Sequence, residues 1–146
     1  MLESGAMKEP GTLAGYAAYL AARTWQATAY LDLGRETMAL SGIVTGADGE
    51  WLLLSGERGR NLCAAGALVR LDMEGPAGPR GENEDLWDRF LTGAEEKGVF
   101  LRVRSVRREL IGIPRIHSEE ILVLESLSGS RSRWERKTLL LLEELP

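Results

Sequence analysis

The sequence predicts a mainly β fold: a five-stranded β-barrel with a helix between the third and fourth strands and an extra N-terminal helix. Short segments of alternating apolar and polar residues recur between glycine-rich turns, which is typical of half-buried strands. One compact stretch, residues 84–97, instead has apolar residues at helical spacing. A chain of 146 residues suits one core, so we divide it into a leader (1–11), one domain (12–128) and a C-terminal extension (129–146).

The first half of the chain is expected to form a helix followed by three strands. Residues 12–31 are rich in alanine and leucine on one face, which favours a helix. Residues 38–45 and 51–55 then form a hairpin, in which Gly42 marks a bulge or a sharp coil of the sheet. Residues 67–73 alternate again and supply the third strand.

The second half is expected to add one helix and two strands. Residues 84–97 form a short amphipathic helix. The stretch "VFLRVR", residues 99–104, alternates apolar side chains with arginines and forms the fourth strand. Residues 111–117 contain a proline and are interpreted as a turn-bearing connection, and residues 118–127 form the fifth strand.

This order of elements resembles the OB-fold, and in particular the small bacterial domains of the tRNA-anticodon-like OB group. In that group an opening helix is followed by a strand of the form V-x-V-x-G-x-V, to which "MALSGIVTG" is similar. A later V-x-V-x-G strand resembles "VFLRVRS", although Ser105 stands where a second glycine is common. The resemblance covers roughly residues 12–127 and implies a ligand face on the second and third strands and two adjoining loops.

Catalytic and metal-binding motifs are absent from the sequence. His117 is the only histidine, so a site built on two histidines is excluded within one chain. Cys63 is the only cysteine, which excludes an intrachain disulfide, and its small apolar neighbours favour a buried, inert thiol. Phosphate-loop, nucleophile-elbow and zinc-protease patterns are missing too. We therefore expect no enzyme activity, no cofactor and no metal.

Arginines provide the candidate ligand-binding surface. The chain has a net charge of −4, yet residues 99–137 hold nine basic and five acidic side chains. A basic groove with one aromatic platform could hold single-stranded DNA or RNA. The alternative is a solvated or protein-facing surface, on which Glu109 and Glu119 neutralise the arginines. The candidate residues are Trp51, Arg58, Arg60, Arg70, Arg102, Arg104 and Arg115.

The C-terminal extension is the second candidate surface. The stretch "RWERKTLLLLEELP" places its cations before its acids, which opposes the dipole of a helix. We expect either an added strand on the domain's own sheet or a segment that docks on a partner through Trp134, Leu139 and Leu141. The chain is thus expected to be a non-catalytic module that binds a protein or its own copy, with single-stranded nucleic acid as the alternative.

The sequence also bears on location. No apolar run is long enough to predict a membrane span. Residues 13–22 have the length of a signal-peptide core, but the residues before them lack the positive charge of such a peptide. With a single cysteine, this favours a cytoplasmic location over a secreted or periplasmic one.

Overall fold

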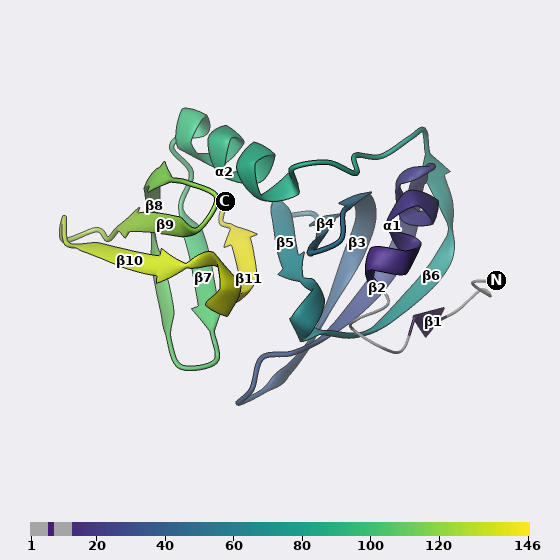
Figure 1. The fold of residues 1–146 in the computed structure, drawn as a ribbon, viewed down its shortest axis with the longest axis horizontal. Coiled ribbons are helices and arrows are strands. Elements are labelled where there is room, and N and C mark those ends of the chain that lie inside the picture. The colour runs from purple at the N-terminus through teal and green to yellow at the C-terminus, as the bar shows by residue number, and fades with distance from the viewer. Residues whose placement is uncertain (1–5, 8–12) are drawn as a thin grey trace.

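The computed structural model describes residues 6–7 and 13–146, and the strands of these residues form one open antiparallel sheet that begins at β1 and ends at β10 (Figure 1). The strand order is β1-β6-β2-β3-β4-β5-β11-β7-β8-β9-β10. The mainly β class is therefore confirmed, whereas the expected five-stranded barrel is not, because the described residues form eleven strands in a sheet that does not close. The elements are β1 (Ala6–Met7), α1 (Leu13–Ala21), β2 (Thr24–Asp32), β3 (Thr37–Ala47), β4 (Trp51–Ser55), β5 (Arg60–Ala64), η2 (Ala65–Ala67), β6 (Leu68–Gly78), α2 (Leu86–Lys97), β7 (Leu101–Ser105), β8 (Glu109–His117), β9 (Ile121–Glu125), β10 (Arg131–Glu135), η3 (Arg136–Thr138) and β11 (Leu139–Glu144).

The sheet consists of two consecutive structural repeats. Repeat one comprises residues 13–78, with α1, β2 to β6 and η2, and repeat two comprises residues 86–144, with α2, β7 to β11 and η3. In each repeat a helix precedes five strands, whose order in the sheet is fifth, first, second, third, fourth. In each, a short 3-10 helix (η2 or η3) joins the fourth strand to the fifth.

The pairing registers show that the repeats correspond residue by residue. On β3 a bulge separates Val44, which pairs with Leu54, from Gly46, which pairs with Leu53. The bulge on β8 falls at the same place, between residues 114 and 116, which pair with residues 124 and 123. Because a bulge shifts the register by one residue, a bulge at the same place means that side chains at equivalent positions point to the same face of the sheet in both repeats.

The second strand of each repeat also contains one glycine that the fold requires. A Cβ atom at Gly42 would lie 2.4 Å from the carbonyl oxygen of Ser55, and one at Gly112 would lie 2.6 Å from that of Glu125. Both distances are too short for a side chain, so the neighbouring strand can approach only a glycine here. The two glycines occupy equivalent positions in the two repeats, because each lies on the second strand and faces the equivalent carbonyl of the third strand.

Helix α2 is packed against both repeats. The ring of Trp87 stacks on that of Trp51 in β4, with centroids 5.5 Å apart. The indole N–H of Trp87 donates a hydrogen bond of 2.7 Å to the carbonyl oxygen of Ser118 in the turn between β8 and β9. Leu86, Trp87 and Phe90 are buried in a core that includes residues of β4, β5, β7, β9 and β11. A second core is formed mainly by residues of repeat one, including Leu13 and Leu20 of α1, and also contains Leu141 of β11.

The two repeats meet where β5 pairs with β11. Here the fourth strand of repeat one lies beside the fifth strand of repeat two, through the pairs Cys63–Leu141, Leu62–Leu142 and Asn61–Glu143. Just beyond them, the guanidinium of Arg60 binds the carboxylate of Glu144 at 2.9 Å. The apolar residues of the first two pairs are buried and belong to one core or the other, so this junction is continuous with both cores.

Several expected boundaries are corrected by this arrangement. The helix expected over residues 12–31 ends at Ala21, because residues 24–32 form β2 between β3 and β6. The expected connection around Pro114 is strand β8, in which the proline lies next to the bulge. The extension 129–146 contains β10 and β11, and β11 is an interior strand of the sheet. Of the expected leader 1–11, only Ala6–Met7 lie within the described residues, as strand β1.

Candidate binding surface

Most of the arginines of the predicted ligand face are paired with carboxylates. Arg60 binds Glu144, as described above. Arg70 lies 2.6 Å from Asp72 on its own strand, and Arg115 lies 2.9 Å from Glu125. Hydrogen bonds from Arg115 and Arg131 lower the pKa of Glu125, so this carboxylate stays ionised beside them. The pairs of Arg60 and Arg115 therefore join neighbouring strands, and the charges of all three arginines are paired with carboxylates of the same chain.

Arg104 is the largely buried centre of an ion cluster whose outer members, Glu36 and Glu109, are exposed. Its side chain is 10% exposed and lies 2.6 Å from Glu36, 2.8 Å from Glu109 and 3.4 Å from Glu143. Glu36 comes from the turn between β2 and β3 of repeat one, whereas the other two come from β8 and β11. The guanidinium of Arg104 therefore faces carboxylates of its own chain and connects the two repeats.

The remaining candidates for nucleic-acid binding are Trp51, Arg58 and Arg102, which lie on different elements. Trp51 is 2% exposed and covered by Trp87, so its ring is not a free stacking platform. Arg58 lies in the turn between β4 and β5, and Arg102 lies on β7. Within the described part of the chain, neither of these two arginines forms an ion pair with a carboxylate.

The three candidate partner-binding residues are buried in the chain's own cores. Trp134 is 1% exposed, and Leu139 and Leu141 are similarly covered. The ring of Trp134 lies beneath Arg108, whose guanidinium carbon is 3.9 Å from the ring centroid. Of the two alternatives for the tail, its leucines therefore take the added strand, β11.

The only histidine and the only cysteine serve the packing of the sheet. His117 on β8 contacts Asp88 through Nε2 at 2.8 Å and Glu95 through Nδ1. Burial would lower the pKa of His117, but the hydrogen bonds to these α2 carboxylates outweigh it, so the pKa is raised. Burial, with the nearby charge of Glu143, raises the pKa of Cys63 to about 12, which keeps the thiol protonated. No cluster suited to a metal ion is found among residues 6–7 and 13–146.

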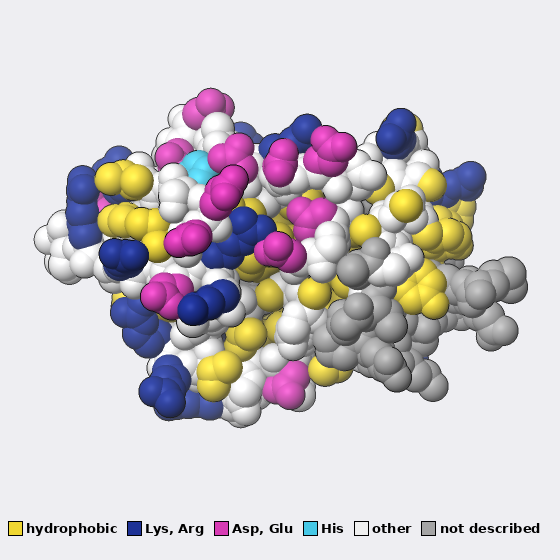
Figure 2. Space-filling view, viewed as in Figure 1, with side chains coloured by type: hydrophobic (Ala, Val, Ile, Leu, Met, Phe, Trp, Pro, Cys, Tyr) yellow, Lys and Arg dark blue, Asp and Glu magenta, His cyan; other side chains and the backbone are white. Residues whose placement is uncertain are grey.

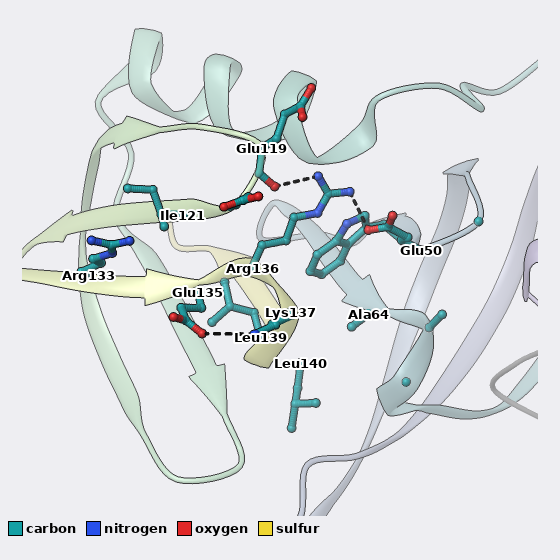
Figure 3. Close-up of a pocket in the computed structure, with 15 residues that line it drawn as sticks. Glu50, Ala64, Glu119, Ile121, Arg133, Glu135, Arg136, Lys137, Leu139 and Leu140 are labelled. Carbon is teal, nitrogen blue, oxygen red and sulfur yellow. Dashed lines mark hydrogen bonds and ion pairs between the residues drawn. The ribbon is translucent and has the colours of Figure 1, made fainter.

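A cavity of about 570 Å³ lies over the junction of the repeats (Figure 3). Its walls are equivalent turns: residues 49–51 and 64–66 of repeat one, and residues 119–121 and 135–137 of repeat two. Arg136 spans it, donating to a carboxylate oxygen of Glu50 at 2.6 Å and to the carbonyl oxygen of Glu119 at 3.0 Å. This bridge crosses the cavity and connects the two repeats, and we do not assign a ligand to the cavity.

The free edge beyond β10 has a different character. Strand β10 pairs with β9 on one side and is the last strand of the sheet. On the nearby strand β8, Ile116 is 53% exposed. On β9, Ile121 and Val123 are half-buried. Figure 2 shows apolar side chains beside basic ones at this end of the molecule. A strand edge next to exposed aliphatic side chains is a surface suited to another polypeptide.

The sequence contained a signal for this surface that composition alone does not show. The segment Leu110-Ile111-Gly112-Ile113 repeats the Leu, Gly and Ile of Leu40-Ser41-Gly42-Ile43. An alignment of the two halves on these glycines would have identified β8, and with it the position of Ile116 on a strand.

Comparison of the chain with protein-family models, with curated proteins and with solved structures finds no match. None of the described helices is both long and apolar enough to cross a membrane.

Proposed function

We propose that this chain is a non-catalytic binding module whose ligand is a protein, with its own copy as the first candidate. The observation that carries the proposal is the edge of β10, which has no further neighbour among the described residues, together with Ile116 on β8, two strands away, which is 53% exposed. An added strand would satisfy the outward backbone groups of β10, and the aliphatic side chains beside it would gain contacts.

The chemistry of the described residues supports binding over catalysis. The groups with shifted pKa values, such as His117 and Glu144, are engaged in contacts that fix α2 or the junction. Cys63 keeps its proton inside the core, where a substrate does not reach it.

The test is sedimentation of the purified full chain over a wide range of concentrations. We expect the average mass to rise with concentration and the variant Ile116→Glu to stay monomeric, because the association buries this side chain. Val106→Glu is the matched control, since Val106 is 54% exposed but lies in the turn between β7 and β8. A monomer at every concentration would remove self-association, and equal loss with both variants would remove the β10 end as the surface.

Single-stranded nucleic acid remains the second candidate, supported by the arginines Arg58 and Arg102 and by the basic side chains at the β10 end. Titration of labelled oligonucleotides at low salt tests it, with Arg102→Glu as the variant. Salt-sensitive binding that this variant weakens would favour nucleic acid. Absence of binding, together with self-association, would leave the protein-binding proposal alone.

A further inference from the structure

We propose that copies of this chain associate head to tail, with β10 of one copy pairing with β6 of the next, in the geometry of the β5–β11 junction within each chain. The inference rests on the proposed protein-binding function and names the partner, the two edges and their register. It is carried by the correspondence between the two repeats.

Each end of the chain presents one half of a junction that the chain already contains. In the middle of the sheet, the fourth strand of repeat one pairs with the fifth strand of repeat two. At one end, the fourth strand of repeat two, β10, has no further neighbour among the described residues. At the other end, the fifth strand of repeat one, β6, is followed only by the two-residue strand β1 in the described part of the chain. A second copy can therefore complete at both ends what the first copy forms internally, once β1 is displaced from Asp72 and Leu71.

The repeat registers fix which residues would meet. Asn61 of β5 pairs with Leu54, and Ser132 of β10 pairs with the equivalent Leu124, so Ser132 corresponds to Asn61. In the same way Leu71 and Leu142 are equivalent, because they pair with Ala29 and Val103 on the first strands. Asp72 of β6 therefore corresponds to Glu143 of β11.

The internal pairs then predict the pairs between copies. Asn61–Glu143 becomes Ser132–Asp72, and Leu62–Leu142 becomes Arg133–Leu71. Arg133 is exposed in the single chain, and its stem can lie on the apolar edge while the guanidinium reaches solvent.

The apolar side chains at the β10 end match positions that α2 covers in repeat one. Ile121 corresponds to Trp51, which is 2% exposed beneath Trp87. Ile116 corresponds to Gly46, where a Cβ atom would lie 3.2 Å from the side chain of Leu86. Repeat two thus keeps aliphatic residues where repeat one is covered by the helix of the following repeat.

The β6 end of the sheet carries a helix, α1, that could cover the apolar side chains at the β10 end of another copy. Helix α1 stands to repeat one as α2 stands to repeat two, because each precedes the first strand and packs on the second. Tyr19 of α1 is 42% exposed and stacks on Trp25, with ring centroids 5.2 Å apart. Val69 on β6 is 38% exposed. Placed as α2 is placed internally, α1 of the next copy would lie over Ile116 and Ile121.

The charges of the two edges are opposite in sign. Strand β10 carries two arginines and one glutamate, whereas β6 carries two carboxylates and one arginine. Such complementarity favours the pairing of β10 with β6 over the pairing of two β10 edges, which would bring four arginines together. Because the contact joins different surfaces, it is repeated from copy to copy, and it forms a ring where the rotation closes and a filament where it does not.

Disulfide trapping tests the register directly. The full-length variants Ser132→Cys and Asp72→Cys are made separately, mixed and mildly oxidised. The buried thiol of Cys63 does not compete, because burial raises its pKa to about 12. We expect a linked dimer from the mixture and little from either variant alone, while the double variant forms a ladder of linked chains. A mixture of Asp72→Cys with Ser128→Cys, which lies in the turn before β10, is the matched control and should remain unlinked.

The outcomes separate this inference from the proposed function. Self-association without a Ser132–Asp72 link, or with linking of Ser132→Cys to itself, overturns the head-to-tail contact and leaves protein binding standing. A chain that is monomeric at all concentrations overturns both. If the folding of either cysteine variant is impaired, the β6 edge is tested instead by a proline variant of β1, because Ile116→Glu reports on the β10 end alone.

Strand β1 offers an independent test, in which the variant is expected to strengthen association rather than weaken it. Ala6 and Met7 pair with Asp72 and Leu71, the positions that the next copy would occupy. Replacing both residues by proline removes their backbone N–H groups and weakens this pairing. We expect the double variant Ala6→Pro, Met7→Pro to associate at lower concentration than the unmodified chain. Unchanged or weaker association would contradict the use of the β6 edge.

Discussion

The two repeats share one backbone arrangement, yet their surfaces differ in what covers them. In repeat one the third and fourth strands lie under α2, and Trp51 is 2% exposed. In repeat two the third strand carries Ile121, which is half-buried, and the second strand carries Ile116, which is 53% exposed. The difference arises because the helix that covers repeat one belongs to repeat two. Position in the array decides the exposure of these residues.

The two repeats also stabilise equivalent turns with different residues. In the turn before β4, the carboxylate of Asp48 accepts hydrogen bonds from the backbone N–H groups of Glu50 and Trp51. In the turn before β9, the hydroxyl of Ser118 accepts them from Glu120 and Ile121. Both are side-chain acceptors that close a tight turn, which is why the structure repeats while the sequence hardly does.

The largest expected effect tests the packing of α2 on repeat one. Trp87→Ala removes the stacking on Trp51 and the hydrogen bond to Ser118, so we expect a loss of about 3–5 kcal/mol in the free energy of unfolding. Urea denaturation measures it. Trp25→Ala is the control, because Trp25 is only half-buried and should cost less. Equal costs for the two variants would contradict the central role of α2.

The next effect tests the equivalence of the repeats. A methyl group at Gly42 or Gly112 would collide with a strand carbonyl, so we expect each change to alanine to cost about 1–3 kcal/mol or more. Gly66→Ala is the control, since no atom lies within 4 Å of the place that its methyl group would take. Thermal denaturation of the three variants checks this. A large loss for only one of the two strand glycines would show that the repeats are not mechanically equivalent.

A smaller effect tests the junction. Burial would raise the pKa of Glu144, but hydrogen bonds from the side chain and backbone of Arg60 outweigh it, so the pKa lies below its ordinary value. The stability that this pair contributes is present above the ordinary pKa of about 4.5 and is lost as the pH falls through the lowered pKa. Glu144→Gln should cost about 1–2 kcal/mol at neutral pH, because the partly exposed Arg60 reduces the usual strength of such bonds.

Urea midpoints of the wild type and Glu144→Gln across the acid range measure this contribution. We expect the two curves to converge as the carboxylate is protonated. Glu125→Gln is the comparison at an exposed ion pair and should change the midpoint less. A constant gap between the wild type and Glu144→Gln down to strongly acid pH would contradict the assignment.

The smallest effect tests the contact between α2 and His117 of β8. This contact has no counterpart in repeat one, because the position equivalent to His117 is occupied by Ala47. The pKa of His117 is raised in the folded chain, so its contribution is full below the ordinary value of 6.5 and is lost as the pH rises through the raised pKa. We expect the melting temperature of His117→Gln to approach that of the wild type at alkaline pH. Asp88→Asn should show a weaker form of the same trend, whereas a gap independent of pH would exclude protonated His117 as the cause.

Much of the secondary structure can be predicted from the sequence, and the failures have physical reasons. The strand at 51–55 and the helix at 84–97 are predicted nearly to the residue because their apolar periods are clear. Strand β2 resembles a helix in sequence because alanine favours helices locally, although Ala27, Ala29 and Leu31 alternate inward once β3 and β6 flank them. Strand β8 resembles a connection because Pro114 usually excludes a strand, except beside a bulge.

The candidate site was less predictable, because it depends on pairing across the chain. The sequence places Arg104 on a strand, but only the fold brings Glu36 and Glu143 to it and removes its charge from the surface. Likewise, the exposure of Ile116 cannot be read from its neighbours, since the equivalent position in repeat one is covered by residues from outside that repeat.

The sequence by itself therefore determined the mainly β class and the periods of β3, β4, β6, β7 and β9, because these depend on local alternation of apolar and polar residues. Tertiary structure decided the pairing of the repeats, the neutralisation of the arginines and the free edge of β10. Those properties depend on contacts between residues far apart in the chain, and a local pattern of residue types carries no information about which distant strand will lie beside it.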